Sequence, residues 1–132
     1  MATIFTRIIR GEIPCHKIAE DERFFAFLDI NPLREGHTLV IPKTETDYFF
    51  DLDDDTLAGL IVFSKKVAKA IREVIPCNRI GVAVIGLEVP HVHVHLVPMD
   101  SMEDINFRNP KLRLSSDELN SLAEKISSKV NL

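Results

Sequence analysis

The sequence predicts an α+β fold: a five-stranded antiparallel meander with one long central helix, a short N-terminal helix and a C-terminal helix. Two observations predict it. Five short runs rich in branched and aromatic residues are separated by turn residues, as strands are, and one long run ending near position 75 has apolar residues at every third or fourth position. No repeat or flexible linker divides the chain, so residues 1–132 are expected to form a single domain.

The first half of the chain supplies the short helix and three strands. Residues 4–9 have helical spacing and end at Gly11, where a left-handed residue closes a helix. Residues 16–20 are expected to be extended. The runs 24–30 and 38–41 are expected to pair, because the NPLREG connection between them has turn chemistry.

The second half begins with an acidic cluster at 51–55, which suits the positive end of a helix dipole and predicts the start of the long helix. Runs 80–85 and 91–98 are expected to form an antiparallel hairpin through the short connection GLEVP. Ser115 and Glu118 form a capping box, which predicts a last helix over about 115–131.

Composition excludes several functional classes. A net charge of -4 argues against sequence-independent nucleic-acid binding, which needs a basic face. The first residues have no leader pattern, and no run approaches the ~20 apolar residues of a membrane span, so we expect a cytoplasmic protein without membrane contact. Cys15 and Cys77 are far apart and are expected to be free thiols.

The segment HVHVHLVP carries the chemistry. In an extended chain, His91, His93 and His95 project from one face, and the intervening apolar residues project from the other. Only His93 neighbours both other rings. An unperturbed imidazole titrates near pH ~6.5, so one ring can be a neutral nucleophile while its neighbours donate hydrogen bonds or carry positive charge. That combination suits attack on phosphorus through a covalent phosphoramidate adduct.

Two other interpretations of these histidines remain open. Plain packing explains single strand histidines well and three alternating ones poorly. A metal enzyme is the stronger alternative, because an H-x-H pair with a third ligand can hold zinc, and His91, His93 and His37 would form that set. Against it, no cysteine lies nearby in the sequence.

Four segments, TIFTRIIRGEIP, EDERFFAFLDINP, EGHTLVIPK and HVHVHLVP, occur in the order and spacing typical of the histidine triad family. Over residues 3–98 the chain resembles that family, and most of all its branch that cleaves purine nucleoside phosphoramidates and related adenylates. The resemblance implies a nucleotide hydrolase or transferase acting on an AMP or GMP derivative. It also implies a homodimer that pairs its long helices, and residues 61–75 could form that contact.

The resemblance also implies roles for individual residues. His93 is implied as the nucleophile that becomes nucleotidylated, with His91, His95 and His37 around it, and Asp29 as the contact to the ribose hydroxyls. The apolar slot for the base is implied at Phe5, Ile8, Phe27, Ile30 and Leu39.

The chain departs from the family in the loop before the triad. Gly86, Leu87 and Glu88 stand where glycine, glutamine and serine or threonine are common, and Ala83 stands where an asparagine often contacts phosphate. Glu88 is open to three interpretations: repulsion of phosphate, pairing with a histidine, or an acid toward the leaving group. These departures predict nucleotide binding with slow turnover, and at the limit a nucleotide-binding module with little catalysis.

A second departure concerns metal. Many bacterial relatives carry C-x-x-C near the N-terminus for a structural zinc, and here Thr3 and Thr6 occupy those positions. The sequence therefore predicts no zinc site and no other cofactor.

Overall fold

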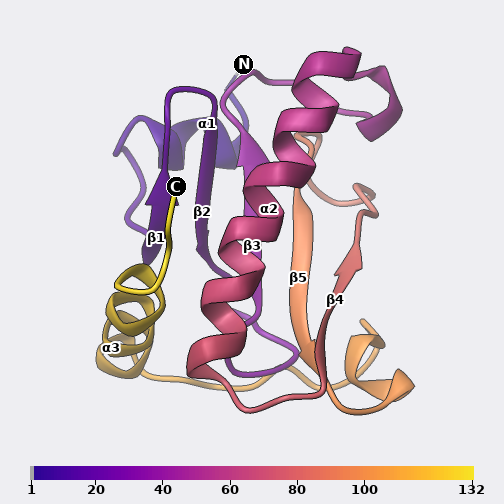
Figure 1. The fold of residues 1–132 in the computed structure, drawn as a ribbon. Coiled ribbons are helices and arrows are strands. Elements are labelled where there is room, and N and C mark those ends of the chain that lie inside the picture. The colour runs from indigo at the N-terminus through magenta and orange to yellow at the C-terminus, as the bar shows by residue number, and fades with distance from the viewer. Residues whose placement is uncertain (1) are drawn as a thin grey trace.

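The computed structural model describes residues 2–132 and shows a five-stranded antiparallel sheet with helices on both faces (Figure 1). The α+β fold class is therefore confirmed. The strands lie side by side in the order β1-β2-β3-β5-β4. Their bounds are β1 Lys17–Glu20, β2 Phe24–Leu28, β3 Thr38–Pro42, β4 Arg79–Ala83 and β5 Val94–Met99.

This strand order corrects the simple meander expected from the sequence, because β5 and not β4 pairs with β3. Helix α2 (Asp54–Val74) leaves β3 and crosses one face of the sheet, a path of about 30 Å at the helical rise. The chain then forms β4 at the edge and turns back inward as β5. Burial explains the order: β5 is buried at all but its last residue, whereas β4 is partly exposed throughout and tolerates an edge.

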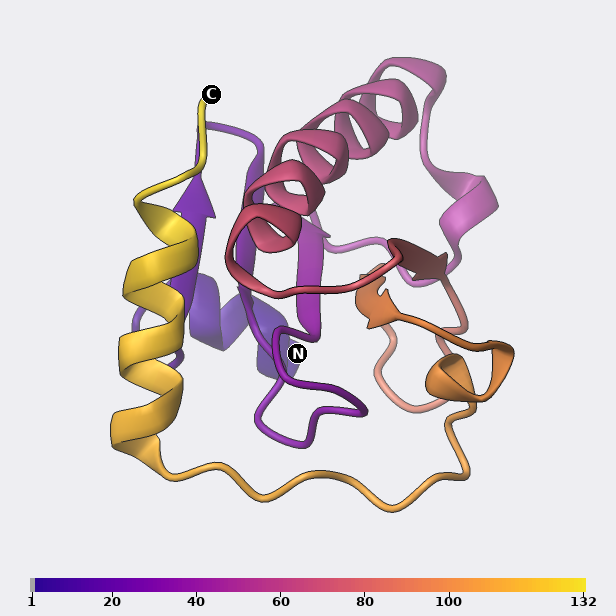
Figure 2. The ribbon, with the colours of Figure 1, turned by 60° about the horizontal axis from the view of Figure 1, so that its bottom comes forward.

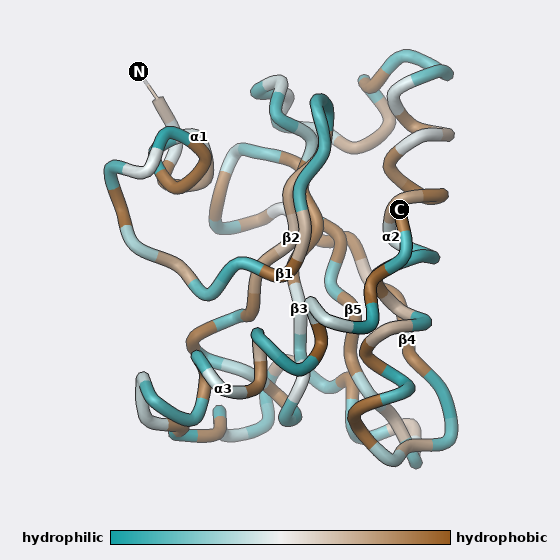
Figure 3. Tube along the Cα trace, turned by 60° about the vertical axis from the view of Figure 1, so that its left-hand side comes forward, coloured by the Kyte–Doolittle hydropathy of each residue, from teal (hydrophilic) through white to brown (hydrophobic). Residues whose placement is uncertain are grey.

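One face of the sheet is covered by α2 and α3 (Ser116–Ser127), with α3 packed on β1 and α2 (Figure 1). The acidic cluster begins α2 as expected, since the Asp53 side chain accepts from the Thr56 N–H at 2.7 Å. The capping box of Ser115 and Glu118 begins α3. In Figure 3 the turns of α3 alternate between hydrophobic and hydrophilic residues, the pattern of a helix with one buried side.

The opposite face carries α1 (Ile4–Ile9) and a separate apolar cluster. Because side chains alternate along a strand, Ala26 and Val40 face the helical layer while Phe27 and Leu39 face α1. The apolar cluster consists of Phe5, Ile8, Phe25, Phe27, Leu39 and Ile41. The histidine face of β5 continues this surface, since Leu39 lies directly opposite His95 in the sheet register.

The segment bearing the histidines is less regular than expected. β5 begins at Val94, so His91 and His93 precede the strand, and the connection from β4 spans 84–93 rather than GLEVP alone. The reason is a contact outside the sheet ladder: the Val92 N–H donates to the carbonyl of Thr46, beyond the end of β3, at 2.7 Å. Val92, Val94 and Leu96 still enter the core together, so the predicted alternation persists.

Other bounds also shift. β2 ends at Leu28, which places Asp29 and Ile30 in the following turn, and α3 ends at Ser127 rather than 131. The chain also forms two short 3-10 helices, η1 (Phe49–Asp51) and η2 (Met102–Ile105). Among residues 2–132, none of the helices combines the length and apolar character needed to cross a membrane.

Candidate active site

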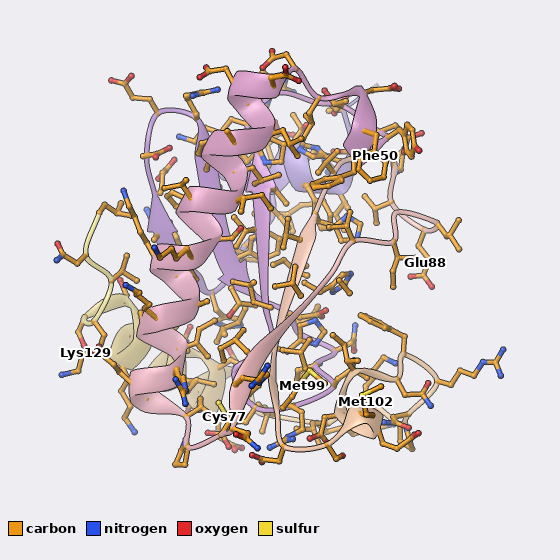
Figure 4. The ribbon with its side chains drawn as sticks, turned by 45° about the vertical axis from the view of Figure 1, so that its right-hand side comes forward. Phe50, Cys77, Glu88, Met99, Met102 and Lys129 are labelled. Atoms are coloured by element: carbon orange, nitrogen blue, oxygen red, sulfur yellow. The ribbon has the colours of Figure 1, made fainter. Side chains whose placement is uncertain are left out.

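A cavity of about 310 Å³ opens on the sheet face away from α2, which is within the size range of small-ligand sites. Three segments surround it: the loop 84–93, the turn between β2 and β3, and the chain that follows η2. Figure 4 shows Glu88 on the first of these, at the surface of the molecule. The cavity is lined by Asp29, Asn31, His37, Ile85, Gly86, Leu87, Glu88, His93, His95, Phe107 and Lys111.

The ring of His93 is fixed in one tautomer. Its Nδ1 lies 2.7 Å from the carbonyl oxygen of His91. A carbonyl can only accept, so Nδ1 carries a proton, and in the neutral form of the ring the lone pair is on Nε2. The ring of Phe5 packs edge-on against it at a centroid distance of 5.0 Å. The neutral form of this ring therefore has Nε2 available as a nucleophile, in a side chain that lines the cavity.

His37 and His95 form a directed hydrogen-bond chain. The Leu33 N–H donates to His37 Nδ1 at 3.0 Å, so the proton of the neutral ring is on Nε2. That Nε2–H donates to His95 Nδ1, also at 3.0 Å, which leaves the His95 proton on Nε2. Burial is the main cause that lowers the pKa of His37 to about 3 and that of His95 to about 4, so both rings are neutral at pH 7.

His91 is fully buried and does not line the cavity. Its Nε2–H donates to the carbonyl of Pro42 at 2.8 Å, and its Nδ1 accepts from the Thr3 hydroxyl at 2.8 Å. Burial lowers its pKa, which agrees with a neutral ring. His91 therefore links the start of α1 to the end of β3, and its carbonyl accepts from the ring of His93. These contacts suit a residue that positions His93 rather than one that contacts a ligand.

The partner of His91 belongs to a larger hydrogen-bonded group at the start of α1. Thr3 caps the helix by accepting from the Thr6 N–H at 3.1 Å. The Thr3 N–H and the Thr6 hydroxyl both donate to Glu45 Oε1, at 2.7 and 2.6 Å. Sequence reasoning noted Thr3 and Thr6 only as replacements for cysteines, and it missed Glu45.

Asp29 lies at the cavity, directly after β2. One carboxylate oxygen accepts from the Asn31 N–H at 2.8 Å, and the other lies 3.6 Å from His37 Nε2. Burial raises the pKa of the Asp29 carboxyl, and the Asn31 N–H partly offsets that rise. The two oxygens of this half-buried carboxylate can accept hydrogen bonds from the hydroxyl groups of a ligand.

The five apolar residues expected at a base slot separate into two groups. Four of them, Phe5, Ile8, Phe27 and Leu39, lie together in the apolar cluster beside His93 and His95. Ile30 stands apart at 62 % exposure, in the turn after β2. None of the five is among the residues that line the cavity.

Comparison with known proteins identifies the family. The HIT domain family matches residues 10–102, well over half of the chain. The chain belongs to the HIT family. It is 38% identical to adenosine 5'-monophosphoramidase hnt1 of Schizosaccharomyces pombe, over 98% of this chain and 99% of that protein. It is 44% identical to an uncharacterised HIT-like protein of Methanocaldococcus jannaschii, over 72% of this chain and 77% of that protein.

Solved HIT structures share the fold as well. A HIT-like protein of Bartonella henselae, described as involved in cell-cycle regulation, superposes with a TM-score of 0.83 at 32% identity. The superposition covers 96% of this chain and 95% of that one. The matched HIT domain includes Asp29 and all four histidines of the cluster, whereas Thr3, Phe107 and Lys111 lie outside it.

The metal set expected as an alternative is not assembled in this HIT domain. Both ring nitrogens of His91 are engaged, and the groups that come together within residues 2–132 are Asp29, His37 and His95, with ligand atoms within 4.8 Å of one another. His37 Nε2 and His95 Nδ1 face each other at hydrogen-bond distance, so a cation there must displace their shared proton. The donor set therefore fits the hydrogen-bond chain better than a metal.

Sequence reasoning missed several residues that line the HIT cavity, among them Asn31, Phe107 and Lys111. Asn31 lies two residues after Asp29 in the same turn, so the local sequence could have indicated it. Phe107 is an isolated aromatic in a polar stretch, which is a weak signal for a surface contact. Nothing in the sequence indicates that Lys111 returns to a site built from residues 29–95.

Proposed function

We propose that this protein hydrolyses adenosine 5'-monophosphoramidate or a related purine nucleotide, through a nucleotide covalently bound to His93. The observation that carries the proposal is the tautomer of His93: Nδ1–H bound to the His91 carbonyl at 2.7 Å, with a free Nε2 in a ring at the cavity. The name of the fission yeast relative, an adenosine 5'-monophosphoramidase, supports the substrate class.

The first step forms the adduct. The Nε2 lone pair of His93 attacks the α-phosphorus, a P–N bond to the ring forms, and the P–N bond to the leaving amine breaks with its electron pair on that nitrogen. The amine takes a proton from solvent and departs as ammonia. The ring becomes cationic, and the His91 carbonyl stabilises the charge because it accepts the Nδ1–H hydrogen bond.

The second step releases the product. Water attacks the phosphorus, loses a proton to solvent, and the electron pair of the P–N bond returns to Nε2, giving AMP and the free imidazole. We propose that the Nε2–H of His95, a ring that lines the cavity, donates to a phosphoryl oxygen in both steps and keeps its proton, because its Nδ1 accepts from His37. No metal is needed for either step, and the hydroxyls of Thr3 and Thr6 are not the thiolates of a structural zinc site.

Binding of the nucleoside uses the remaining predicted residues. Asp29 is proposed to accept hydrogen bonds from the ribose hydroxyls, and the apolar cluster of Phe5, Ile8, Phe27 and Leu39 to form the floor against the base, with Ile30 closing over it. The support is their placement: Asp29 lines the cavity, and the apolar cluster continues from it toward α1.

We also propose a homodimer. α2 carries Ile61 and Val62 on its exposed side, at 46 % and 52 % exposure, and two such faces would bury each other. Light scattering at micromolar concentration tests this: twice the 14.9 kDa chain mass supports the dimer, and the chain mass alone contradicts it.

Mass spectrometry of protein quenched during turnover tests the mechanism. Incubation with adenosine 5'-monophosphoramidate is expected to add the mass of an adenylyl group to the peptide that contains His93. The increment is expected to be absent from His93→Ala and retained in His16→Ala, which alters a histidine on the distant β1 side of the fold. AMP binding without any adduct or turnover would favour a nucleotide-binding module instead.

A further inference from the structure

The chain that follows η2 forms one wall of the cavity. Figure 2 shows this segment running from η2 to α3 along one edge of the molecule. The Leu112 N–H donates to the carbonyl of Pro32 at 2.9 Å, which ties the segment to the turn between β2 and β3. Two of its side chains, Phe107 and Lys111, line the cavity, and both lie beyond the matched HIT domain.

Phe107 covers the paired histidines. Its ring packs edge-on against His95 at a centroid distance of 4.7 Å and against His37 at 6.2 Å. An aromatic wall in this position limits water access to the hydrogen bond between the two rings. It also places the backbone of the segment close enough for the next turn to reach the cavity.

Lys111 brings a cation to the same wall. Its Nζ donates to the carbonyls of Phe107 and Asn109, at 2.6 and 3.1 Å, and an ammonium has a third N–H to give. No carboxylate among residues 2–132 pairs with it within 4 Å. Among the described residues that line the cavity, Lys111 is the one Lys or Arg.

The loop 84–93, which forms another wall of the cavity, explains why a cation is needed. Leu87 and Glu88 line the cavity, and their side chains supply an apolar group and a negative charge rather than hydrogen-bond donors. Asp29 adds a second carboxylate. A phosphate held at His93 therefore meets two acidic groups and receives no hydrogen bond from the side chains of Leu87 and Glu88, so a positive charge from another segment is needed to offset the repulsion.

We infer that Lys111 binds the phosphoryl oxygens of the nucleotide, and that the segment beyond the HIT domain thereby supplies the phosphate contact that the side chains of Leu87 and Glu88 do not provide. The inference rests on the proposed function, since it requires a nucleotide in this cavity. Lysine binds phosphate as a point charge, and the two carbonyls that hold Nζ orient it before the ligand arrives.

Calorimetric titration with AMP and with adenosine tests the contact. Lys111→Gln is expected to weaken AMP binding about tenfold and to leave adenosine binding unchanged. Lys129→Gln removes the same charge just beyond the end of α3, on the far side of the molecule from Glu88 in Figure 4, and is expected to leave the binding of both ligands unchanged. Lys111→Arg is expected to retain most of the AMP affinity, because it keeps the charge.

Each other outcome has a distinct meaning. Equal AMP affinity in Lys111→Gln and the parent protein, or an equal loss for AMP and adenosine, overturns the phosphate contact while the hydrolase proposal stands. AMP binding that depends on Lys111, without any adduct at His93, overturns the hydrolase and supports the contact. A parent protein that does not bind AMP overturns both.

Discussion

The hydroxyl of Thr3 lies 2.8 Å from Nδ1 of His91, so the first turn of α1 is fastened to the residue whose carbonyl orients His93. The connection continues outward to Glu45, which accepts from both Thr3 and Thr6. Three hydrogen bonds thus lead from a surface carboxylate to the ring of His93. The orientation of His93 depends on contacts at the very start of the chain.

Removing the Thr3 hydroxyl tests this connection. Thr3→Val keeps the shape but loses the helix cap and the 2.8 Å donor to buried His91 Nδ1, and the Thr6 hydroxyl lies 3.5 Å from that nitrogen, so we expect the free energy of unfolding to fall by about 2 kcal/mol. Turnover is expected to fall as well, because the His91 carbonyl is less firmly placed. Urea unfolding and a phosphoramidate assay measure the two effects.

Thr3→Ser is the matched control, since it keeps the hydroxyl and should stay close to the parent protein in both assays. Thr6→Val removes a bond to Glu45 and leaves the contact between Thr3 and His91 in place, so its effect should be smaller. If Thr3→Val leaves both stability and turnover unchanged, His91 does not position the ring of His93 as we infer.

Local patterns in the sequence were sufficient for much of this fold. The alternation of HVHVHLVP placed Val92, Val94 and Leu96 in the core and kept His93 and His95 on the other side, because burial along an extended chain repeats every two residues. The capping box of Ser115 predicted the start of α3 for a similar reason, since both partners lie within one turn.

The remaining features depend on contacts between distant parts of the chain. Thr3 and His91 are 88 positions apart, and no local pattern links them. The place of β5 between β3 and β4 depends on how α2 crosses the sheet, which the strand sequences alone do not specify. Lys111 reaches the cavity only because Leu112 is tied to Pro32.

The loop before the histidines predicts slow turnover. Leu87 donates no hydrogen bond from its side chain, and Glu88 brings a negative charge to the cavity, so we expect nucleoside monophosphate binding with phosphoramidate hydrolysis below about 1 per second, under the ~10 per second typical of enzymes. A steady-state assay on purified protein measures the rate. Brisk turnover would refute the prediction.

Replacing Glu88 separates the roles that remained open for it. If its charge repels phosphate, Glu88→Gln tightens AMP binding about threefold and raises turnover, since the repulsion is partly screened by solvent. Glu22→Gln removes the same charge in the exposed turn between β1 and β2 and should have no effect. A fall in turnover with unchanged AMP affinity would instead assign Glu88 as the acid toward the leaving group.

Phe107 is expected to control the titration of His95. Burial is the main cause that lowers the pKa of His95 to about 4, and the Phe107 ring at 4.7 Å is part of that burial. Phe107→Ala admits water and should raise the pKa of His95 toward its ordinary value, whereas Phe107→Leu should change it less. A nitrogen-15 NMR titration of the His95 ring measures its pKa in each variant. Equal pKa values in Phe107→Ala and Phe107→Leu would show that Phe107 does not shield His95 from water.

Acid is expected to destabilise the protein through its buried neutral histidines. The pKa of His37 is lowered to about 3, whereas an unfolded histidine titrates near ~6.5. Between these values the unfolded chain binds more protons than the folded one, so the free energy of unfolding falls as the pH falls from ~6.5 toward the folded pKa. Each such proton contributes a slope of about 1.4 kcal/mol per pH unit.

Urea unfolding between pH 7 and pH 4.5 measures this slope in the parent protein and in His37→Asn. Asparagine can accept from the Leu33 N–H and donate toward His95, but it does not titrate. Carboxylates titrate in both proteins, so the difference between the two slopes isolates His37. We expect the stability of His37→Asn to fall less steeply than that of the parent protein below pH 6. Identical slopes would show that His37 is already protonated in the folded state. A protonated His37 could not accept from the Leu33 N–H, so the hydrogen-bond chain to His95 would be broken.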